Sequence, residues 1–548
     1  MLPKAVVLSL LLLVFFTACQ NTERKTRYVP VTEAAPAMEA PAAPADESAA
    51  VANDVASPAT IEKMEPMTLT SETFKDYGEN PFTNTLQQPV STFAIDADGA
   101  SYANVRRFLT NGQLPPPAAV RVEEMVNYFP FDYANPTDGK PIALNGEISD
   151  CPWAKGHKLL RLGVKGKDIA RQELPACNFV FLVDVSGSMD DPDKLDLLKE
   201  AFLLFSETLR PQDKVAIVTY AGEAGVALES TSGKNVGAIR KAIKNMESGG
   251  STNGAGGIHK AYEIAQQNFI RNGNNRVLLA TDGDFNVGVS SEEELVKLIE
   301  KKRESGVFLT VIGVGEGNYQ DAKMEQLADN GNGTYEYLDN LQQAEKVFVQ
   351  EFGKFFTVAQ DVKIQFRFNP KLVKSYRLVG YENRMLEREE FYDDKKDAGE
   401  IGAGQCITAL YEIEPVVKPE TWGQKVKSLA WLTGVTPEKP LDASAALRIN
   451  CRYKTPGAKE SQPFSLDLLA QTTDFGSASE NMRFATAVAS AGMLLKQSEN
   501  KGDLKWKDVI NWANHADGFD PGQWRSEFVE MAQEAKSQLE PGLFSEVR

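Results

Sequence analysis

The stretch FVFLVDVSGSMDDPDKL, residues 179–195, decides both the fold and the candidate site of this chain. It opens with an apolar run that predicts a buried strand, and a helical pattern follows. Between them lies a tight turn that carries one carboxylate and two hydroxyls, from Asp184, Ser186 and Ser188. Open α/β sheets bind ligands at the carboxyl ends of their strands, and hard oxygen ligands suit Mg²⁺. The stretch therefore predicts a metal-assisted binding site.

Two later segments add oxygen ligands of the same kind. The glycine-rich loop 249–253 contributes the hydroxyl of Thr252, and the apolar run 277–281 is followed directly by Asp282. An alternative interpretation is that these residues are only helix caps and turns, because Asp, Ser and Thr cap helices and Asp-Gly favours a turn. The order of the segments and their position at strand ends favour a single site.

This order, Asp-x-Ser-x-Ser, then Thr, then Asp, resembles the metal-ion-dependent adhesion site of von Willebrand factor type A domains. The resemblance implies that Mg²⁺ or Mn²⁺ is bound by Asp184, Ser186, Ser188, Thr252 and Asp282. It also implies that an exposed Asp or Glu of a partner protein completes the coordination.

The segments around the motif predict a doubly wound, mostly parallel α/β domain. Near-continuous apolar runs at 178–183, 214–220, 276–281 and 307–314 are typical of parallel strands covered on both faces, and 334–338 adds a short strand. Helical patterns between them cover 195–209, 255–270, 291–305 and 340–355. The alternation places this domain at residues 177–354.

Short alternating runs on both sides of this domain predict a β-sandwich. They lie at 143–149, 158–165, 362–369, 376–381, 405–414, 445–453 and 462–468. The simplest topology inserts the α/β domain into a loop of a sandwich made of residues 141–176 and 355–470. Residues 68–140 are predicted to form an amino-terminal α+β domain, and 471–548 a helical carboxy-terminal region.

The amino end predicts export and a lipid anchor. Lys4, the apolar run 5–16 and Thr17-Ala18 form a signal peptide over residues 1–18. Cys19 then resembles the lipidated cysteine of bacterial lipoproteins, although an ordinary signal peptide that contains a cysteine is the alternative. Gln20 resembles a sorting signal for the outer rather than the inner membrane. Residues 19–67, rich in Ala and Pro, predict a disordered tether.

Composition excludes some classes of function. The chain has 76 acidic and 59 basic residues and a formal net charge of −17, which disfavours nucleic acid as a partner.

Two classes of enzyme are disfavoured by the residues at the motif. A phosphatase of the haloacid dehalogenase type would need Asp where Ser186 stands. A serine hydrolase would need a base beside its nucleophile, and none of the three histidines is placed to suggest one. We expect no enzymatic activity. A structural protein with a non-functional metal site is the alternative to a binding module.

Two further features leave alternatives open. Besides Cys19, the four cysteines Cys151, Cys177, Cys406 and Cys451 permit two disulfides of unknown connectivity, but Cys406 and Cys451 fit a buried core equally well. Asp96-Ala97-Asp98-Gly99 resembles the start of a twelve-residue calcium-binding loop. Such a loop needs a bidentate Glu at its last position, where this chain has Arg107. Asp98 is therefore interpreted as a helix cap.

Longer stretches carry a closer resemblance. The segments ASYANVRRFLTNGQLPPPAAVRVEEMVNYFPFDY (100–133) and GYENRMLEREEFYDDKKDAGEIGAG (380–404), with the helical tail, resemble a bacterial family of exported type A proteins. The resemblance implies an amino-terminal domain before the type A core and an uncharacterised domain after it. The expected function is a membrane-anchored, metal-dependent adhesion or scaffold module of the cell envelope.

Overall fold

The computed structural model describes residues 72–95, 98–137, 139–222, 224–250, 254–283, 292–416, 441 and 444–540. The predicted signal peptide, Cys19 and the tether lie outside these residues. Within the described ranges, no helix is both long and apolar enough to cross a bilayer.

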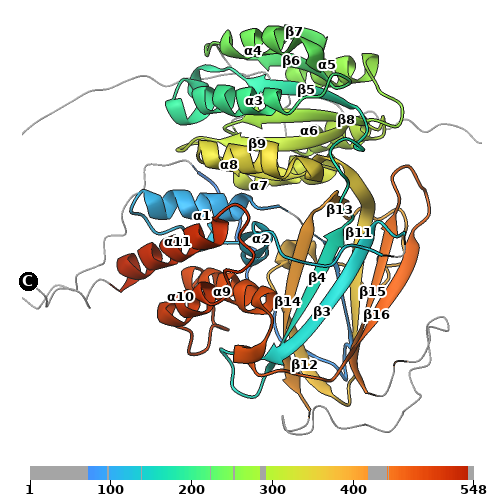
Figure 1. Ribbon diagram of the computed structural model, residues 1–548, viewed down its shortest axis with the longest axis vertical. Helices are drawn as coiled ribbons and strands as arrows, with labels where there is room; N and C mark the ends of the chain where they lie inside the picture. Colours follow the sequence, from blue (N-terminus) through green and yellow to red (C-terminus); the bar gives the residue numbers. More distant parts are fainter. Residues whose placement is uncertain are drawn as a thin grey trace, which may run out of the picture. The chain divides into compact units, whose positions relative to one another are not determined.

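A six-stranded sheet forms the centre of the inserted domain (Figure 1). Its order is β10-β9-β8-β5-β6-β7, in which only the edge strand β7 is antiparallel to its neighbour. The strands are β5 (Cys177–Asp184), β6 (Lys214–Tyr220), β7 (Ala224–Ser232), β8 (Asn274–Thr281), β9 (Phe308–Val314) and β10 (Tyr335–Leu338). The predicted doubly wound, mostly parallel sheet is thereby confirmed.

Helices cover both faces of this sheet because successive strand residues point to opposite sides. Phe179 and Phe181 of β5 share a core with α3 (Leu197–Glu207), α4 (Val236–Lys244) and α8 (Leu341–Glu345). Val180 and Leu182 share the opposite core with α5 (Gly254–Gln267), α6 (Glu292–Arg303) and α7 (Asp321–Asn330). The helix predicted over 340–355 is divided into α8, a π-helical turn Lys346–Gln350 and a 3₁₀ turn Phe352–Phe355.

The sandwich consists of two antiparallel sheets, with strands from both sides of the inserted domain. One sheet has the order β1-β12-β14-β4-β3. Its strands are β1 (Thr83–Asn84), β3 (Ile142–Asp150), β4 (Lys158–Gly166), β12 (Val373–Val379) and β14 (Cys406–Pro415). The other has the order β13-β11-β15-β16, and β2 also pairs with β11. Its strands are β2 (Val90–Ala94), β11 (Thr357–Phe368), β13 (Gly399–Gly402), β15 (Ala445–Lys454) and β16 (Gln462–Leu469).

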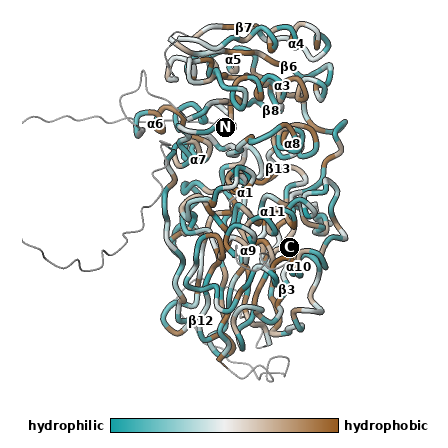
Figure 2. The backbone as a smooth tube through the Cα atoms, turned by 90° about the vertical axis from the view of Figure 1, so that its left-hand side faces the viewer, coloured by the Kyte–Doolittle hydropathy of each residue, from teal (hydrophilic) through white to brown (hydrophobic). Residues whose placement is uncertain are grey.

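The two sheets enclose one core, to which β4 contributes Leu160 and Leu162 and β11 contributes Ile364 and Phe366. Hydrophobic and hydrophilic residues mix along the strands around β12 in Figure 2. Because β4 ends before the type A domain and β11 begins after it, the predicted insertion into a sandwich is confirmed.

The helices at the two ends of the sandwich sequence pack together. They are α1 (Ala100–Thr110), α2 (Val122–Asn127), α9 (Glu480–Leu495), α10 (Trp506–Asn514) and α11 (Trp524–Leu539). In Figure 1, α1 (blue) lies beside α11 (red), although more than 400 residues separate them in the sequence. Phe129, Phe484 and Phe528 form an aromatic triad with ring centroids 5.0–5.7 Å apart. The predicted amino-terminal and carboxy-terminal regions therefore share a single core.

Two details of the sequence analysis are decided by the structure. All four described cysteines are free, so the permitted disulfides are not formed. Asp98 does not cap α1: the N-cap is Gly99 without a side-chain hydrogen bond. Instead, Asp98 Oδ1 accepts the backbone N–H of Tyr335 at 2.9 Å. The interpretation of Asp98 as a helix cap was wrong because a tertiary partner satisfies its carboxylate.

Candidate metal site

Two adjacent parallel strands bring Asp184 and Asp282 to the same edge of the sheet. Asp184 is the last residue of β5, and Asp282 directly follows β8, which pairs with β5 in parallel. Both side chains are fully buried. Thr281 Oγ1 donates a hydrogen bond to Asp184 Oδ2 at 3.3 Å. The pairing of the strands therefore fixes both carboxylates, as the sequence predicts.

The turn after β5 places the two serine hydroxyls together. The backbone N–H of Ser186 donates to Asp184 Oδ1 at 2.9 Å, which closes an Asx turn. Ser186 Oγ and Ser188 Oγ lie 3.1 Å apart, and Ser188 is partly exposed. One carboxylate and two hydroxyls thus gather within five residues, and the half-buried Ser188 gives this cluster an open side.

The loop that leads to Thr252 is attached to this turn. The N–H of Gly187 donates to the carbonyl of Gly250 at 3.1 Å, and the N–H of Gly249 donates to the carbonyl of Val185 at 2.7 Å. Gly250 has a φ of +88°, which favours glycine. Thr252 itself lies outside the described residues, so its role as a ligand stays a prediction.

Two residues missed by the sequence analysis contact Asp282. Lys194 Nζ lies 3.2 Å from Asp282 Oδ2, and Asn318 Nδ2 donates to the same oxygen at 2.9 Å. Lys194 Nζ also donates to the carbonyl of Ser188 at 3.0 Å, so it joins both halves of the site. The signal for Asn318 was available: it follows β9, the next parallel strand to end at this edge.

The donor set fits a hard divalent cation. It offers two carboxylates and two hydroxyls, and no sulfur or imidazole. Burial raises the pKa of Asp184 to about 6 against the N–H of Ser186, and the charge of Asp282 adds to the rise. The pKa of Asp184 thus indicates that the protein alone compensates this buried carboxylate incompletely. A divalent cation held by Asp184, Ser186, Ser188 and Asp282 would supply the missing positive charge and accept a further oxygen ligand.

A cavity of about 480 Å³ lies elsewhere, and none of the four predicted ligands that the structure describes lines it. Its walls include Trp524 and two lysines, Lys346 and Lys354, from the turns that follow α8. Lys346 pairs with Glu351, and Lys354 pairs with Glu336 and Glu351. These charges neutralise one another and leave no unpaired lysine to bind a ligand. We therefore interpret the cavity as a gap between packed elements and not as the functional site.

Three family models match consecutive parts of the chain. The von Willebrand factor type A domain matches residues 178–350. A model described as von Willebrand factor matches residues 68–161, and the carboxy-terminal domain of the uncharacterized protein YfbK matches residues 353–538. The three matches follow the order of the amino-terminal helices and first sandwich strands, the inserted domain, and the remaining sandwich and helices.

The chain is also similar to individual proteins and to solved structures. The uncharacterized protein YfbK of Escherichia coli (strain K12) is 42% identical over 468 residues, which cover 84% of this chain and 80% of that protein. The uncharacterized protein sll0103 of Synechocystis is 26% identical over 221 residues, covering 40% of this chain and 50% of that protein. Among solved structures, a von Willebrand factor type A protein from Catenulispora acidiphila is similar at 15% identity and a TM-score of 0.40, covering 72% of this chain and 89% of that one.

Proposed function

We propose, from the premise that this chain belongs to the YfbK family of von Willebrand factor type A proteins, that it is a metal-dependent protein-binding module. The observation that carries the proposal is that Asp184, Ser186, Ser188 and Asp282 lie together at the carboxyl ends of the adjacent strands β5 and β8. The proposed place of action is the bacterial cell envelope, with Cys19 as a lipid anchor in the outer rather than the inner membrane.

Binding would depend on a carboxylate of the partner. Ser186 and Ser188, with Thr252 as predicted, offer neutral oxygens to Mg²⁺ or Mn²⁺ and leave much of its charge uncompensated. Lys194 adds a fixed positive charge beside Asp282. An exposed Asp or Glu of a partner protein is therefore the favoured further ligand, and its geometry gives specificity.

A structural envelope protein with a non-functional metal site is the second candidate. Lys194 favours it, because the ammonium group already neutralises Asp282 from within the chain. Under this alternative, the site is a buried ion pair and the sandwich makes the contacts with partners. The two candidates differ in one measurable property, the dependence of binding on divalent cations.

We propose no catalytic role. His157 Nδ1 lies 2.6 Å from Glu412 Oε1, and His515 Nδ1 lies 2.7 Å from the carbonyl oxygen of Asn511. These two imidazoles are engaged away from Ser186 and Ser188. Hydrolysis by a serine nucleophile would need a base beside those hydroxyls.

The test is a pull-down from native envelope with the full chain as bait. Partners of the wild type should be lost in EDTA, return with Mg²⁺ and be absent with Asp184→Ala. Asp282→Ala should act in the same way, Thr252→Ala should weaken binding, and the three substitutions should be non-additive because they act through one ion. Asp196→Ala is the matched control, since it removes an exposed carboxylate that pairs with Lys199. Binding that is indifferent to EDTA and to all three site variants would favour the structural alternative.

The anchor is tested separately by Cys19→Ser. The variant should move from the membrane fraction to the soluble fraction, because stable anchoring needs the acyl chains on this cysteine. If the variant still pellets in a background without binding partners, the lipoprotein proposal is wrong while the binding proposal stands.

A further inference from the structure

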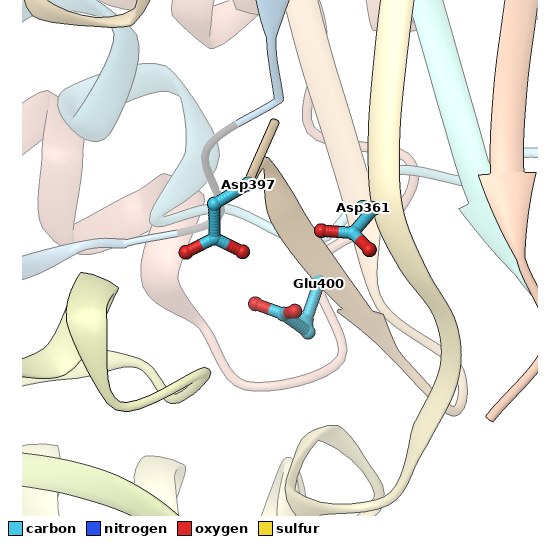
Figure 3. A group of neighbouring side chains, drawn as sticks. All are labelled: Asp361, Asp397 and Glu400. Carbon is cyan, nitrogen blue, oxygen red and sulfur yellow. The ribbon is translucent and has the colours of Figure 1, made fainter. Parts of the chain in front are cut away.

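A second group of oxygen ligands lies away from the strand edge that carries Asp184. Asp361 of β11, Asp397 and Glu400 of β13 point towards one another (Figure 3). One carboxylate oxygen from each lies within 4.8 Å of the others. This spacing leaves room for a cation at the centre of the three carboxylates.

A local irregularity of β11 directs Asp361 into this group. The register between β11 and β13 shifts on both sides of Ala359, and Asp361 has a φ of +50°. Bulges of this kind turn a side chain away from the regular alternation of the strand. Asp361 therefore faces the segment of Asp397 and Glu400, and the N–H of Ala398 donates to Asp361 Oδ1 at 3.3 Å.

Two basic residues hold the outer oxygens of the group. Lys454 Nζ pairs with Asp361 Oδ2 at 2.6 Å, and Arg303 of α6 pairs with Asp397 Oδ2. Glu400 has no such partner: its Oε1 is buried and accepts no hydrogen bond from the described residues. The buried Oε1 of Glu400 therefore lacks the partner that a cation at the centre of the group would supply.

An adjoining cavity gives independent support for a ligand. It has a volume of about 210 Å³ and is lined by Asp397, Glu400, Thr334 and Asn383, among others. Thr334 is only 9% exposed, and its Oγ1 finds no hydrogen-bond partner in the described part of the chain. Asn383 Oδ1 is likewise buried without a donor. Buried oxygens without partners around a polar space of this size indicate ordered water, such as the water ligands of a metal ion.

We propose that Asp361, Asp397 and Glu400 bind a calcium ion whose water ligands occupy this cavity. Ca²⁺ accepts six to eight oxygens at about 2.3–2.6 Å in flexible geometry, whereas Mg²⁺ demands a near-ideal octahedron at about 2.1 Å. The three carboxylates come from an irregular strand, a loop residue and a short strand, an arrangement that suits the flexible geometry of the larger ion. Each carboxylate has two oxygens, so Arg303 and Lys454 keep their pairs while the inner oxygens bind the metal.

The position of this site gives it a role. Arg303 belongs to α6 of the type A domain, whereas Asp361 and Glu400 belong to the sandwich. A calcium ion bound by Asp361, Asp397 and Glu400 fixes the position of Asp397, which forms the ion pair with Arg303. Calcium therefore stabilises the attachment of the type A domain to the sandwich, and this effect is independent of the adhesion-type site at Asp184.

The experiment uses the full chain carrying Asp184→Ala, so that the adhesion-type site contributes nothing. Equilibrium dialysis should find one bound Ca²⁺. Thermal unfolding in about 5 mM Ca²⁺, above the range of extracellular calcium modules, should occur at least about 2 °C higher than in EDTA. The gain in Mg²⁺ should be smaller. Glu400→Gln, added to this background, should unfold in EDTA at the same or a higher temperature and should lose the gain from Ca²⁺.

Glu390→Gln is the matched control, because Glu390 is an acid of the same segment that pairs with Lys396. It should keep the full gain from Ca²⁺. The proposal is overturned if the Asp184→Ala chain binds no Ca²⁺, or if Glu400→Gln keeps the gain. Equal gains in Mg²⁺ and Ca²⁺ would overturn the assignment to calcium. A Glu400→Gln chain that fails to fold in EDTA would show that Glu400 has a structural partner, and this would also contradict the proposal.

Discussion

At the level of single residues, Lys194 brings a positive charge into the predicted metal site. Its side chain is 5% exposed, and its ammonium group contacts Asp282, Ser188 and Asn318. The aliphatic stem lies against Gly315, where a Cβ would come within 2.4 Å of it. In the absence of metal, Lys194 therefore stabilises the sheet edge that carries Asp184 and Asp282. A bound cation and Lys194 would both contact the carboxylate of Asp282.

Replacing Lys194 by methionine should destabilise the metal-free chain by about 3 kcal/mol, because a buried carboxylate loses its partner. The loss should be smaller in Mg²⁺, since the metal then compensates Asp282. Denaturant unfolding in EDTA and in Mg²⁺ measures both values. Lys199→Met, which breaks only the exposed pair with Asp196, should change stability by less than about 1 kcal/mol in either condition. An equal loss for Lys194→Met in both conditions would argue that no metal binds beside Asp282.

His157 makes stability depend on pH. The hydrogen bond to Glu412 raises the pKa of His157. Although burial alone would raise it, the hydrogen bonds from His157 and Trp153 and the charge of Arg377 hold the pKa of Glu412 below its ordinary value. The charged pair therefore stabilises the fold fully below the unfolded pKa of histidine, about 6.5, and this contribution is lost as the pH rises through the raised value.

His157→Gln should therefore lower the free energy of unfolding more at about pH 5.5 than at about pH 9. Urea unfolding at the two pH values checks the difference. His259→Gln should show the opposite trend, because burial and the nearby Lys302 lower the pKa of His259. Protonation of His259 at low pH destabilises the wild type, and the glutamine variant does not lose this stability because its side chain does not titrate. The same trend for both variants would contradict the assigned shifts.

At the level of elements, the contact of α5 with the sheet depends on a glycine. A Cβ at Gly257 would lie 2.9 Å from Tyr220 Cβ and 3.0 Å from Leu182 Cδ1, both of which are fully buried. The absence of a side chain lets α5, the helix that follows Thr252, approach β5 and β6 closely. Close packing at this position therefore sets where α5 begins relative to the strand edge.

Gly257→Ala should destabilise the chain by about 1 kcal/mol net, because overpacking costs more than the gain in helix propensity. Gly237→Ala in α4 is the matched control: nothing lies within 4 Å of a Cβ there. That variant should gain up to about 1 kcal/mol, since alanine loses less entropy in a helix. Thermal unfolding of both variants measures the sign. A stabilised Gly257→Ala chain would show that α5 can move outward freely.

At the level of the whole molecule, the two ends of the folded chain stabilise each other. Arg106 of α1 pairs with Asp339, which follows β10, and with Glu527 of α11. Arg121, just before α2, pairs with Asp321 of α7. These buried pairs join the helical core to the type A domain. Residues 68–140, predicted as a domain of their own, thus share their stability with segments far away in the sequence.

Phe528→Ala in α11 should destabilise the fold by about 3–5 kcal/mol, because it leaves a cavity beside Phe129 and Phe484. Hydrogen exchange should show faster exchange in α1 as well as in α11, although the two helices are distant in sequence. Phe269→Ala, at a ring that is 44% exposed, should cost about 1 kcal/mol or less and leave exchange in α1 unchanged. If hydrogen exchange in α1 stays as slow as in the wild type in both variants, the two ends of the chain fold independently.

The sequence predicted the elements whose patterns are strong. The apolar runs of β5, β6, β8 and β9 are long and uninterrupted because both faces of these strands are buried. The seven alternating runs of the sandwich were found for a similar reason, since one face of each meets a core. β7, α4 and α7 were missed: β7 reads AGVALESTS, and none of its residues is fully buried, so its sequence lacks an apolar run.

The sequence by itself determined the order of the layers, the insertion and the two strand ends that carry Asp184 and Asp282. Parallel pairing then leaves one edge for both carboxylates, and this follows from topology alone. Only the tertiary structure decided the partners that reach the edge, Lys194 and Asn318, and the group formed by Asp361, Asp397 and Glu400. These side chains come from turns, loops and strand irregularities, whose course depends on packing between distant segments, so no local periodicity records where they meet.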